Sequence, residues 1–152
     1  MARPSNAPAY EEDFVAWLED QAQHARCREI DALDLENIAE ELEGMARSDR
    51  RELRNRLTVL LTHLLKCWMR AERRSISSLG TIAEQRDQIT MLLEDSPSLR
   101  SYPAQILDRC YPEARRRAAL QMRSREGALP EACPFSIADV LDIGWLPAHR
   151  DR

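Results

Sequence analysis

Apolar residues recur at every third or fourth position over most of the chain, and this spacing is the feature that most limits its fold. The longest such stripe lies within residues 34–70 and contains Leu35, Ile38, Ala39, Leu42, Met45, Leu53, Leu57, Leu60, Leu61, Leu64 and Trp68. At about 3.6 residues per turn, this spacing places the apolar side chains on one face of a helix. Because no segment shows the alternating pattern of a strand, we expect an all-α fold.

The stripes predict four main helices and a short C-terminal one. The first begins near Tyr10, and the second covers residues 34–70, either as one helix or as two joined near residues 47–49. A third helix follows a polar break at residues 75–80, and a fourth follows Ser98. The last begins at Ser136. Each helix has one apolar stripe that it cannot bury alone, and the connections are short, so we expect an antiparallel bundle.

Individual residues refine these boundaries. Asp34 is expected to be the N-cap of the second helix, with Asn37 as its partner, and Ser98 the N-cap of the fourth. Pro112 falls inside the fourth helix, where an interior proline predicts a kink or a break. The 152 residues suit a single domain. We place this domain at residues 10–147, with a flexible N-terminal arm at 1–9 and a flexible tail at 148–152.

Charges are distributed unevenly along the chain. Residues 1–46 have a net charge of −9, residues 47–125 of +8 and residues 126–152 of −3, and Lys66 is the only lysine beside 21 arginines. Such asymmetry indicates either nucleic-acid binding or charged faces that pair within a bundle or a dimer. A nucleic-acid-binding domain is usually basic as a whole, whereas the net charge here is −4. We therefore favour pairing, although codon bias towards arginine would give the same excess.

No feature of the sequence predicts export or membrane insertion. The longest apolar stretch, Leu57–Met69, is polar at four positions and is shorter than the roughly 20 residues of a spanning helix. The N-terminal residues lack the apolar stretch of a signal peptide. Four widely spaced cysteines (Cys27, Cys67, Cys110 and Cys133) are typical of reduced thiols. We therefore expect a cytoplasmic protein without membrane contact.

Two His/Cys pairs are weak candidates for metal ligands. His24 and Cys27 are three residues apart, and His63 and Cys67 are four apart, a spacing that permits a zinc site without being specific for one. A di-iron bundle would use Glu-x-x-His pairs, and the sequence has none. The glutamates at positions 36, 40 and 43 are therefore interpreted as a solvated face. We expect neither a metal nor a cofactor.

Several motifs, in order along the chain, resemble one family of small bacterial proteins. They are the segments YEEDFVAW (10–17), LDLENIAEELE (33–43), RSDRRELR (47–54), HLLK (63–66), ERRS (72–75), TIAEQR (81–86) and LLEDSPSL (92–99). The chain is similar to domain-of-unknown-function family 29, and the resemblance implies an all-helical fold without an assigned activity. The family pattern has tryptophan where this chain has Cys67 and Ser78, which weakens the zinc interpretation further.

The motifs also contain nine polar residues that are not expected in a core. They are Asp13, Glu36, Asn37, Glu40, His63, Lys66, Arg74, Gln85 and Arg86. We expect some of them to converge into a buried polar network that fixes helix register, or into a cleft with His63 as the proton-transfer group.

Three functions follow from these patterns, in order of preference. The first is a non-enzymatic helical protein-interaction module that binds a protein partner or a second copy as a homodimer. The alternative is a small-ligand-binding or hydrolase-like protein with a polar site near His63. The third is nucleic-acid binding through the central arginine-rich stretch. It ranks last because few aromatic residues are interleaved with the arginines.

Overall fold

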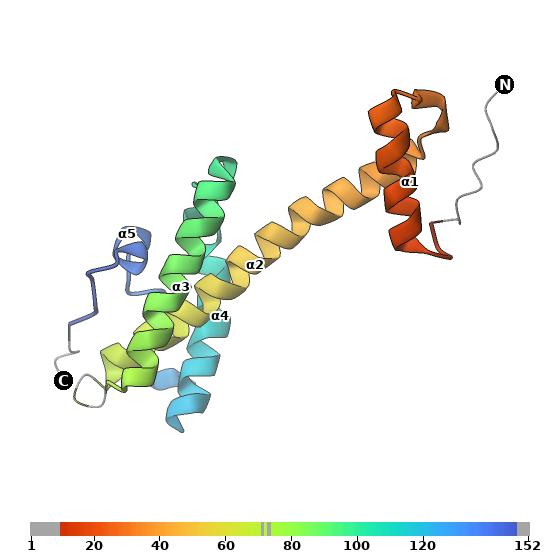
Figure 1. The fold of residues 1–152 in the computed structure, drawn as a ribbon. Coiled ribbons are helices and arrows are strands. Elements are labelled where there is room, and N and C mark those ends of the chain that lie inside the picture. Colours follow the sequence, from red (N-terminus) through yellow and green to blue (C-terminus); the bar gives the residue numbers. More distant parts are fainter. Residues whose placement is uncertain (1–9, 71, 73, 149–152) are drawn as a thin grey trace. The chain divides into compact units, whose positions relative to one another are not determined.

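The all-α prediction is confirmed. The computed structural model describes residues 10–70, 72 and 74–148, and within them it contains five α-helices and no strand. The helices are α1 (Phe14–Cys27), α2 (Leu35–Met69), α3 (Ile76–Asp95), α4 (Tyr102–Met122) and α5 (Ile137–Leu141) (Figure 1). The expected arm at residues 1–9 lies outside the described residues, as does the expected tail apart from Ala148. None of the described helices is both long enough and apolar enough to span a bilayer.

The chain divides into two compact units. The N-terminal unit comprises residues 1–47 and the C-terminal unit residues 48–152. Helix α2 contributes residues to both units, and it is a single helix rather than two. The division falls where the sequence suggested a junction, yet the helix continues through it. As expected, Asp34 caps this helix, since its Oδ1 accepts from the backbone N–H of Asn37 at 3.3 Å.

The C-terminal unit contains the hydrophobic core. Helix α3 runs back beside the end of α2, and α4 returns beside α3, so that consecutive helices are antiparallel (Figure 1). The core side chains come from α2 to α5 and include Leu53, Leu57, Leu60, Leu61, Leu64, Ile82, Ile89, Ile106, Ala114, Ala118 and Val140. Burial of each large aliphatic side chain contributes about 1.5–3 kcal/mol. The leucine-rich half of α2 is therefore the centre of this unit.

The predicted starts of α1, α3 and α4 are wrong, and α1 begins at Phe14 rather than near Tyr10. The expected polar break at residues 75–80 is mostly helical, because Ser75 caps α3 by accepting from the N–H of Ser78 at 3.0 Å. Ser98 lies in a short 3-10 turn, Pro97–Leu99, and α4 begins only at Tyr102. Pro112 does not break α4. It is exposed, as is Asp108, so water can solvate the Asp108 carbonyl that loses its helical partner.

The N-terminal unit buries little. Among its described residues only Trp17 and Gln21 are buried, with 3% and 8% of their surface exposed. The Gln21 side chain accepts from the N–H of Asp34 at 2.7 Å, and the hydroxyl of Tyr10 donates to Glu41. The Tyr10 ring also contacts Trp17, with centroids 4.9 Å apart. Polar and aromatic contacts, rather than an extensive core, hold α1 to the start of α2.

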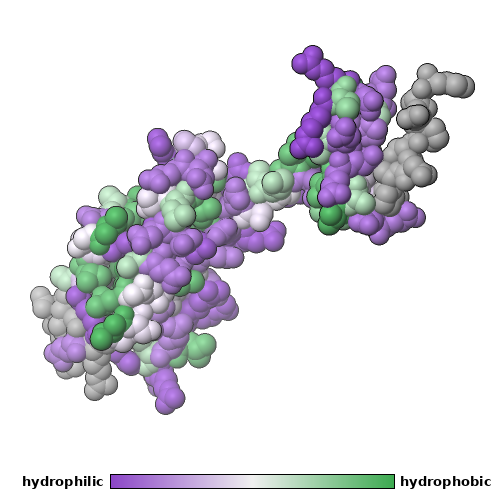
Figure 2. Space-filling view, in the orientation of Figure 1, coloured by the Kyte–Doolittle hydropathy of each residue, from purple (hydrophilic) through white to green (hydrophobic). Residues whose placement is uncertain are grey.

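The apolar stripe of α2 is covered in one half and uncovered in the other. Leu35 and Leu42 are 59% and 61% exposed, whereas Leu53 and Leu60 are fully buried. Leu53 lies five complete helical turns after Leu35, at about 3.6 residues per turn, and Leu60 lies five turns after Leu42. The two leucines of each pair therefore lie on one line along the helix. Apolar side chains thus reach the surface of the N-terminal unit among hydrophilic neighbours (Figure 2).

Candidate functional site

The nine polar residues singled out in the sequence fall into two groups. Four belong to the N-terminal unit: Asp13, Glu36, Asn37 and Glu40. Five belong to the C-terminal unit: His63, Lys66, Arg74, Gln85 and Arg86. Convergence of residues from both groups in one site remains a prediction, so each group is described within its own unit.

Helix starts account for two residues of the N-terminal group. Asp13 caps α1 by accepting from the N–H of Ala16 at 3.0 Å. Asn37 donates through Nδ2 to Asp34 at 2.7 Å, and hydrogen bonding to Asn37 lowers the pKa of Asp34. Glu36 and Glu40 are exposed. These contacts give the group a structural role at helix termini.

Arg86 is a buried side chain that clamps two helices together. Only 3% of it is exposed, and its guanidinium donates to the carbonyls of Val140 (2.9 Å), Ile143 (3.4 Å) and Asp139 (3.4 Å). It thereby joins α3 to α5 and satisfies carbonyls at the end of that short helix. Burial lowers the pKa of Arg86, an effect that Asp142 opposes. The adjacent Gln85 accepts from Arg56 at 3.4 Å.

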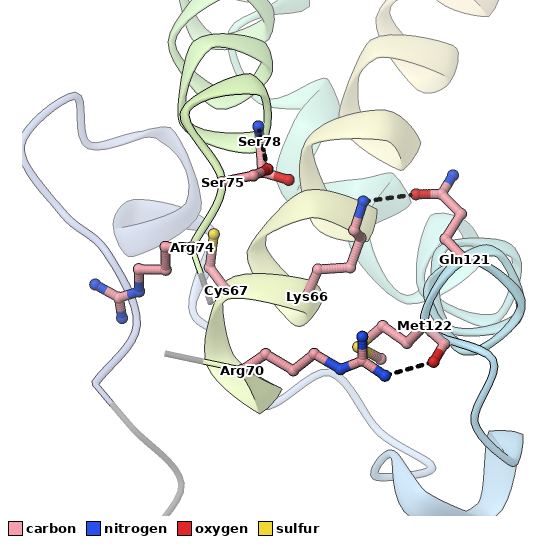
Figure 3. Close-up of a pocket in the computed structure, with 8 residues that line it drawn as sticks. All are labelled: Lys66, Cys67, Arg70, Arg74, Ser75, Ser78, Gln121 and Met122. Carbon is pink, nitrogen blue, oxygen red and sulfur yellow. Dashed lines mark hydrogen bonds between the residues drawn. The ribbon is translucent and has the colours of Figure 1, made fainter. Parts of the chain in front are cut away.

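A cavity of about 100 Å³ lies where the ends of α2 and α4 meet the start of α3 (Figure 3). It is lined by Lys66, Cys67, Arg70, Arg74, Ser75, Ser78, Gln121 and Met122. Lys66 and Arg74 were predicted from the sequence. Cys67 and Ser78, where the resemblance implies tryptophan, also lie in this lining.

His63 adjoins this cavity through Ser78. Its Nδ1 lies 3.2 Å from Ser78 Oγ, and burial, aided by the charge of Lys66, lowers the pKa of His63. Burial raises the pKa of the neighbouring Cys67, which disfavours the thiolate form that a nucleophile requires. Within the part of the chain that the structure describes, no carboxylate contacts His63, so the orienting acid of a catalytic triad is missing there.

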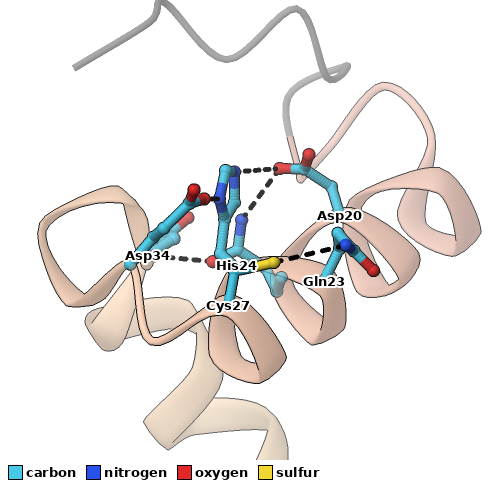
Figure 4. Close-up of polar contacts among 7 residues, drawn as sticks. Asp20, Gln23, His24, Cys27 and Asp34 are labelled. Carbon is cyan, nitrogen blue, oxygen red and sulfur yellow. Dashed lines mark hydrogen bonds and ion pairs between the residues drawn. The ribbon is translucent and has the colours of Figure 1, made fainter.

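The two His/Cys pairs make other contacts. His24 lies between two carboxylates, with Nδ1 2.6 Å from Glu29 and Nε2 3.3 Å from Asp20 (Figure 4). The thiol of Cys27 accepts from Gln23 at 3.4 Å. Among the described side chains, no three His, Cys, Asp or Glu residues gather where they could hold a metal ion.

Sequence reasoning missed five of the eight residues that line the cavity. They are Arg70, Ser75, Ser78, Gln121 and Met122, none of which belonged to the candidate set. Ser75 has a recognisable signal, since serine before an apolar stripe is a preferred N-cap. Gln121 has none, because its approach to Lys66 depends on how α4 packs beside α2.

The two described imidazoles should titrate on opposite sides of the ordinary histidine pKa of 6.5. The hydrogen bond to Glu29 raises the pKa of His24, so its stabilising contribution is complete below pH 6.5 and is lost as the pH rises through the folded pKa. The pKa of His63 is lowered, so the contribution of this residue to folding stability is complete above pH 6.5. That contribution is lost as the pH falls through the pKa of the folded state. NMR titration of the imidazole carbons measures both midpoints.

Single substitutions assign these midpoints. His24→Gln should remove only the higher one and His63→Gln only the lower one, while His149 provides a third signal present in both variants. Coincident midpoints for His24 and His63 would contradict the contacts described above.

The comparisons with known proteins give a family without a function. A family model described as "Domain of unknown function DUF29" matches residues 9–146, which is most of the chain. No curated protein and no solved structure matches it.

Proposed function

Because the chain belongs to the DUF29 family, whose description names no activity, we propose a function from its geometry. The protein is a non-enzymatic helical interaction module that binds a second copy of itself through its N-terminal unit. A cytoplasmic location is part of this proposal, and it is supported by four free cysteines, which are typical of a reducing compartment.

The uncovered stripe of α2 is the observation that carries this proposal. Leu35, Leu42 and Met45 are exposed on α2, and Phe14, Val15 and Leu18 are exposed on α1. A unit of 47 residues rarely folds stably on so little buried surface without further support such as oligomerisation. Burial of these side chains against a partner would supply that support.

The spacing of the stripe fits a second copy running in the opposite direction. We define the seam as Leu35, Ile38, Leu42 and Met45, which are separated by three, four and three residues. This order of intervals is the same when it is read backwards. In an antiparallel pair, Leu35 of one copy therefore faces Met45 of the other, and Ile38 faces Leu42, as in the layers of a coiled coil.

The acidic residues do not obstruct this pairing. At 100° per residue, Glu36, Glu40 and Glu43 lie roughly 120–180° from the centre of the seam. They therefore lie on the opposite face of α2 and remain solvated in the dimer. Residues 1–46 still have a net charge of −9, so two such units repel each other at long range and added salt should strengthen the dimer.

Sedimentation equilibrium of the full chain over a micromolar dilution series tests the proposal. We expect a mass of twice 17.5 kDa for the native chain and the monomer mass for Leu42→Glu, because a charge in the seam must be desolvated. The matched control is Leu120→Glu, which changes an exposed leucine of α4 and should remain dimeric.

Two results would overturn self-association: a native chain that is monomeric throughout, or a Leu42→Glu variant that remains a dimer. The effect of salt provides a further test. A dimer that weakens with added salt would contradict an apolar seam between two acidic units, and it would instead indicate binding to a basic surface.

A further inference from the structure

We propose that the cavity at the junction of α2, α3 and α4 binds a small tetrahedral oxyanion of the phosphate class. The cavity belongs to the C-terminal unit and is separate from the seam. Its volume of about 100 Å³ is several times the roughly 10–15 Å³ that one water molecule requires. It therefore has room for an ion of a few heavy atoms.

The cations of the cavity have neutral partners. Lys66 Nζ donates to the side-chain oxygen of Gln121 at 2.9 Å, and the guanidinium of Arg70 donates to the carbonyl of Met122 (Figure 3). Within residues 10–70, 72 and 74–148, no carboxylate forms an ion pair with either side chain. An ammonium has three donors and a guanidinium five, so both retain donors for an anion.

Other groups of the lining add positive potential. The charges of Arg74 and Lys66 both act on the Cys67 thiol between them. Arg74 directs its guanidinium away from the cavity and donates to the carbonyl of Pro147 (Figure 3), and its buried Nε has no hydrogen-bond partner among the described residues. Ser75 is the N-cap of α3 and Ser78 lies in its first turn, which is the positive end of the helix dipole. These charges favour a compact anion over a neutral ligand.

Calorimetric titration of inorganic phosphate into the full chain, in chloride at constant ionic strength, tests this site. The native chain should bind saturably, and Lys66→Gln should weaken binding by about tenfold or more, because a charged hydrogen bond is lost. Gln121→Glu should weaken it similarly, since its new carboxylate would occupy Lys66. The control, Gln105→Glu, makes the same charge change at the other end of α4 and should bind as the native chain does.

Absence of saturable binding to the native chain would overturn the proposal. Equal weakening in Gln105→Glu and Gln121→Glu would overturn it as well, because it would indicate a general effect of charge. Circular dichroism of each variant verifies that it is folded, and Gln121→Glu retains the shape of the native side chain.

His63 provides a second readout of the same site. An anion beside Lys66 and Ser78 favours the imidazolium form, so saturating phosphate should move the NMR midpoint of His63 to higher pH in the native chain. At the same phosphate concentration, the shift should be smaller in Lys66→Gln. Binding that leaves the His63 midpoint unchanged would place the anion elsewhere and contradict the proposal.

Discussion

Replacement of Arg86 by methionine should lower the free energy of unfolding by about 2–4 kcal/mol. The side chain is buried and donates to three backbone carbonyls of residues 139–143, which would lose their charged donor. Methionine fills similar space, so loss of hydrogen bonding rather than a cavity dominates the effect. Urea denaturation followed by circular dichroism measures this change.

The tryptophan at the C-terminal end of the unit reports whether the clamp holds α5 in place. Trp145 packs on Phe135 with ring centroids 5.5 Å apart, and release of the segment would move its fluorescence to longer wavelength. Arg86→Lys should be intermediate, because one ammonium cannot reproduce a planar fork of donors. The exposed Arg116, paired with Glu113, is the control, and Arg116→Met should change stability by less than about 0.5 kcal/mol. A similarly small effect at Arg86 would show that the clamp does not stabilise the fold.

Leu60→Ala and Leu42→Ala should differ greatly in their effect on stability, although the two leucines lie on one line of α2. Leu60 is fully buried, so its truncation leaves a cavity and should cost about 2–5 kcal/mol. Leu42 is 61% exposed, and its truncation should cost less than about 0.5 kcal/mol in the monomer. Chemical denaturation at a concentration below that of self-association makes this comparison.

The same pair separates monomer stability from association. At higher concentration the native chain gains stability from its partner by mass action, and Leu42→Ala should reduce that gain. Leu60→Ala should lower stability at every concentration tested. Equal losses for the two variants in the dilute sample would mean that Leu42 is buried within the monomer, which would contradict its exposure.

Much of this fold could be predicted from the sequence, because helical periodicity depends on local spacing. Residue types at known intervals predict the apolar stripes of α1 to α5 and the cap at Asp34. The wide spacing of the cysteines likewise predicts that they are free, as they are in the structure. The start of α3 could not be located as easily, since Ser75, Ser77 and Ser78 resemble a loop until one of them is known to cap a helix. Pro112 was misleading because its effect depends on exposure, which the sequence does not contain.

The candidate site was less predictable for a different reason. A cavity forms where distant helix ends meet, and Lys66 and Gln121 are 55 residues apart. Arg86 was singled out as a motif residue not expected in the core, yet it is buried. Its partners are main-chain carbonyls, which are the same at every position of the sequence. Among the described residues, most ion pairs of the arginine-rich stretch join side chains three or four residues apart, as between Arg56 and Glu52 at 2.7 Å. Arg115 instead pairs with Glu126, eleven residues along the chain, at 3.3 Å.

The two halves of α2 should tolerate substitution differently. In residues 53–67, most substitutions of apolar side chains would disturb the core and lower the stability of the fold. In residues 35–46 the exposed side chains have little packing to lose, so substitutions there alter the surface while leaving the monomer intact. One helix thus combines a segment in which variation is suppressed with a segment in which new binding preferences can arise at little cost in stability.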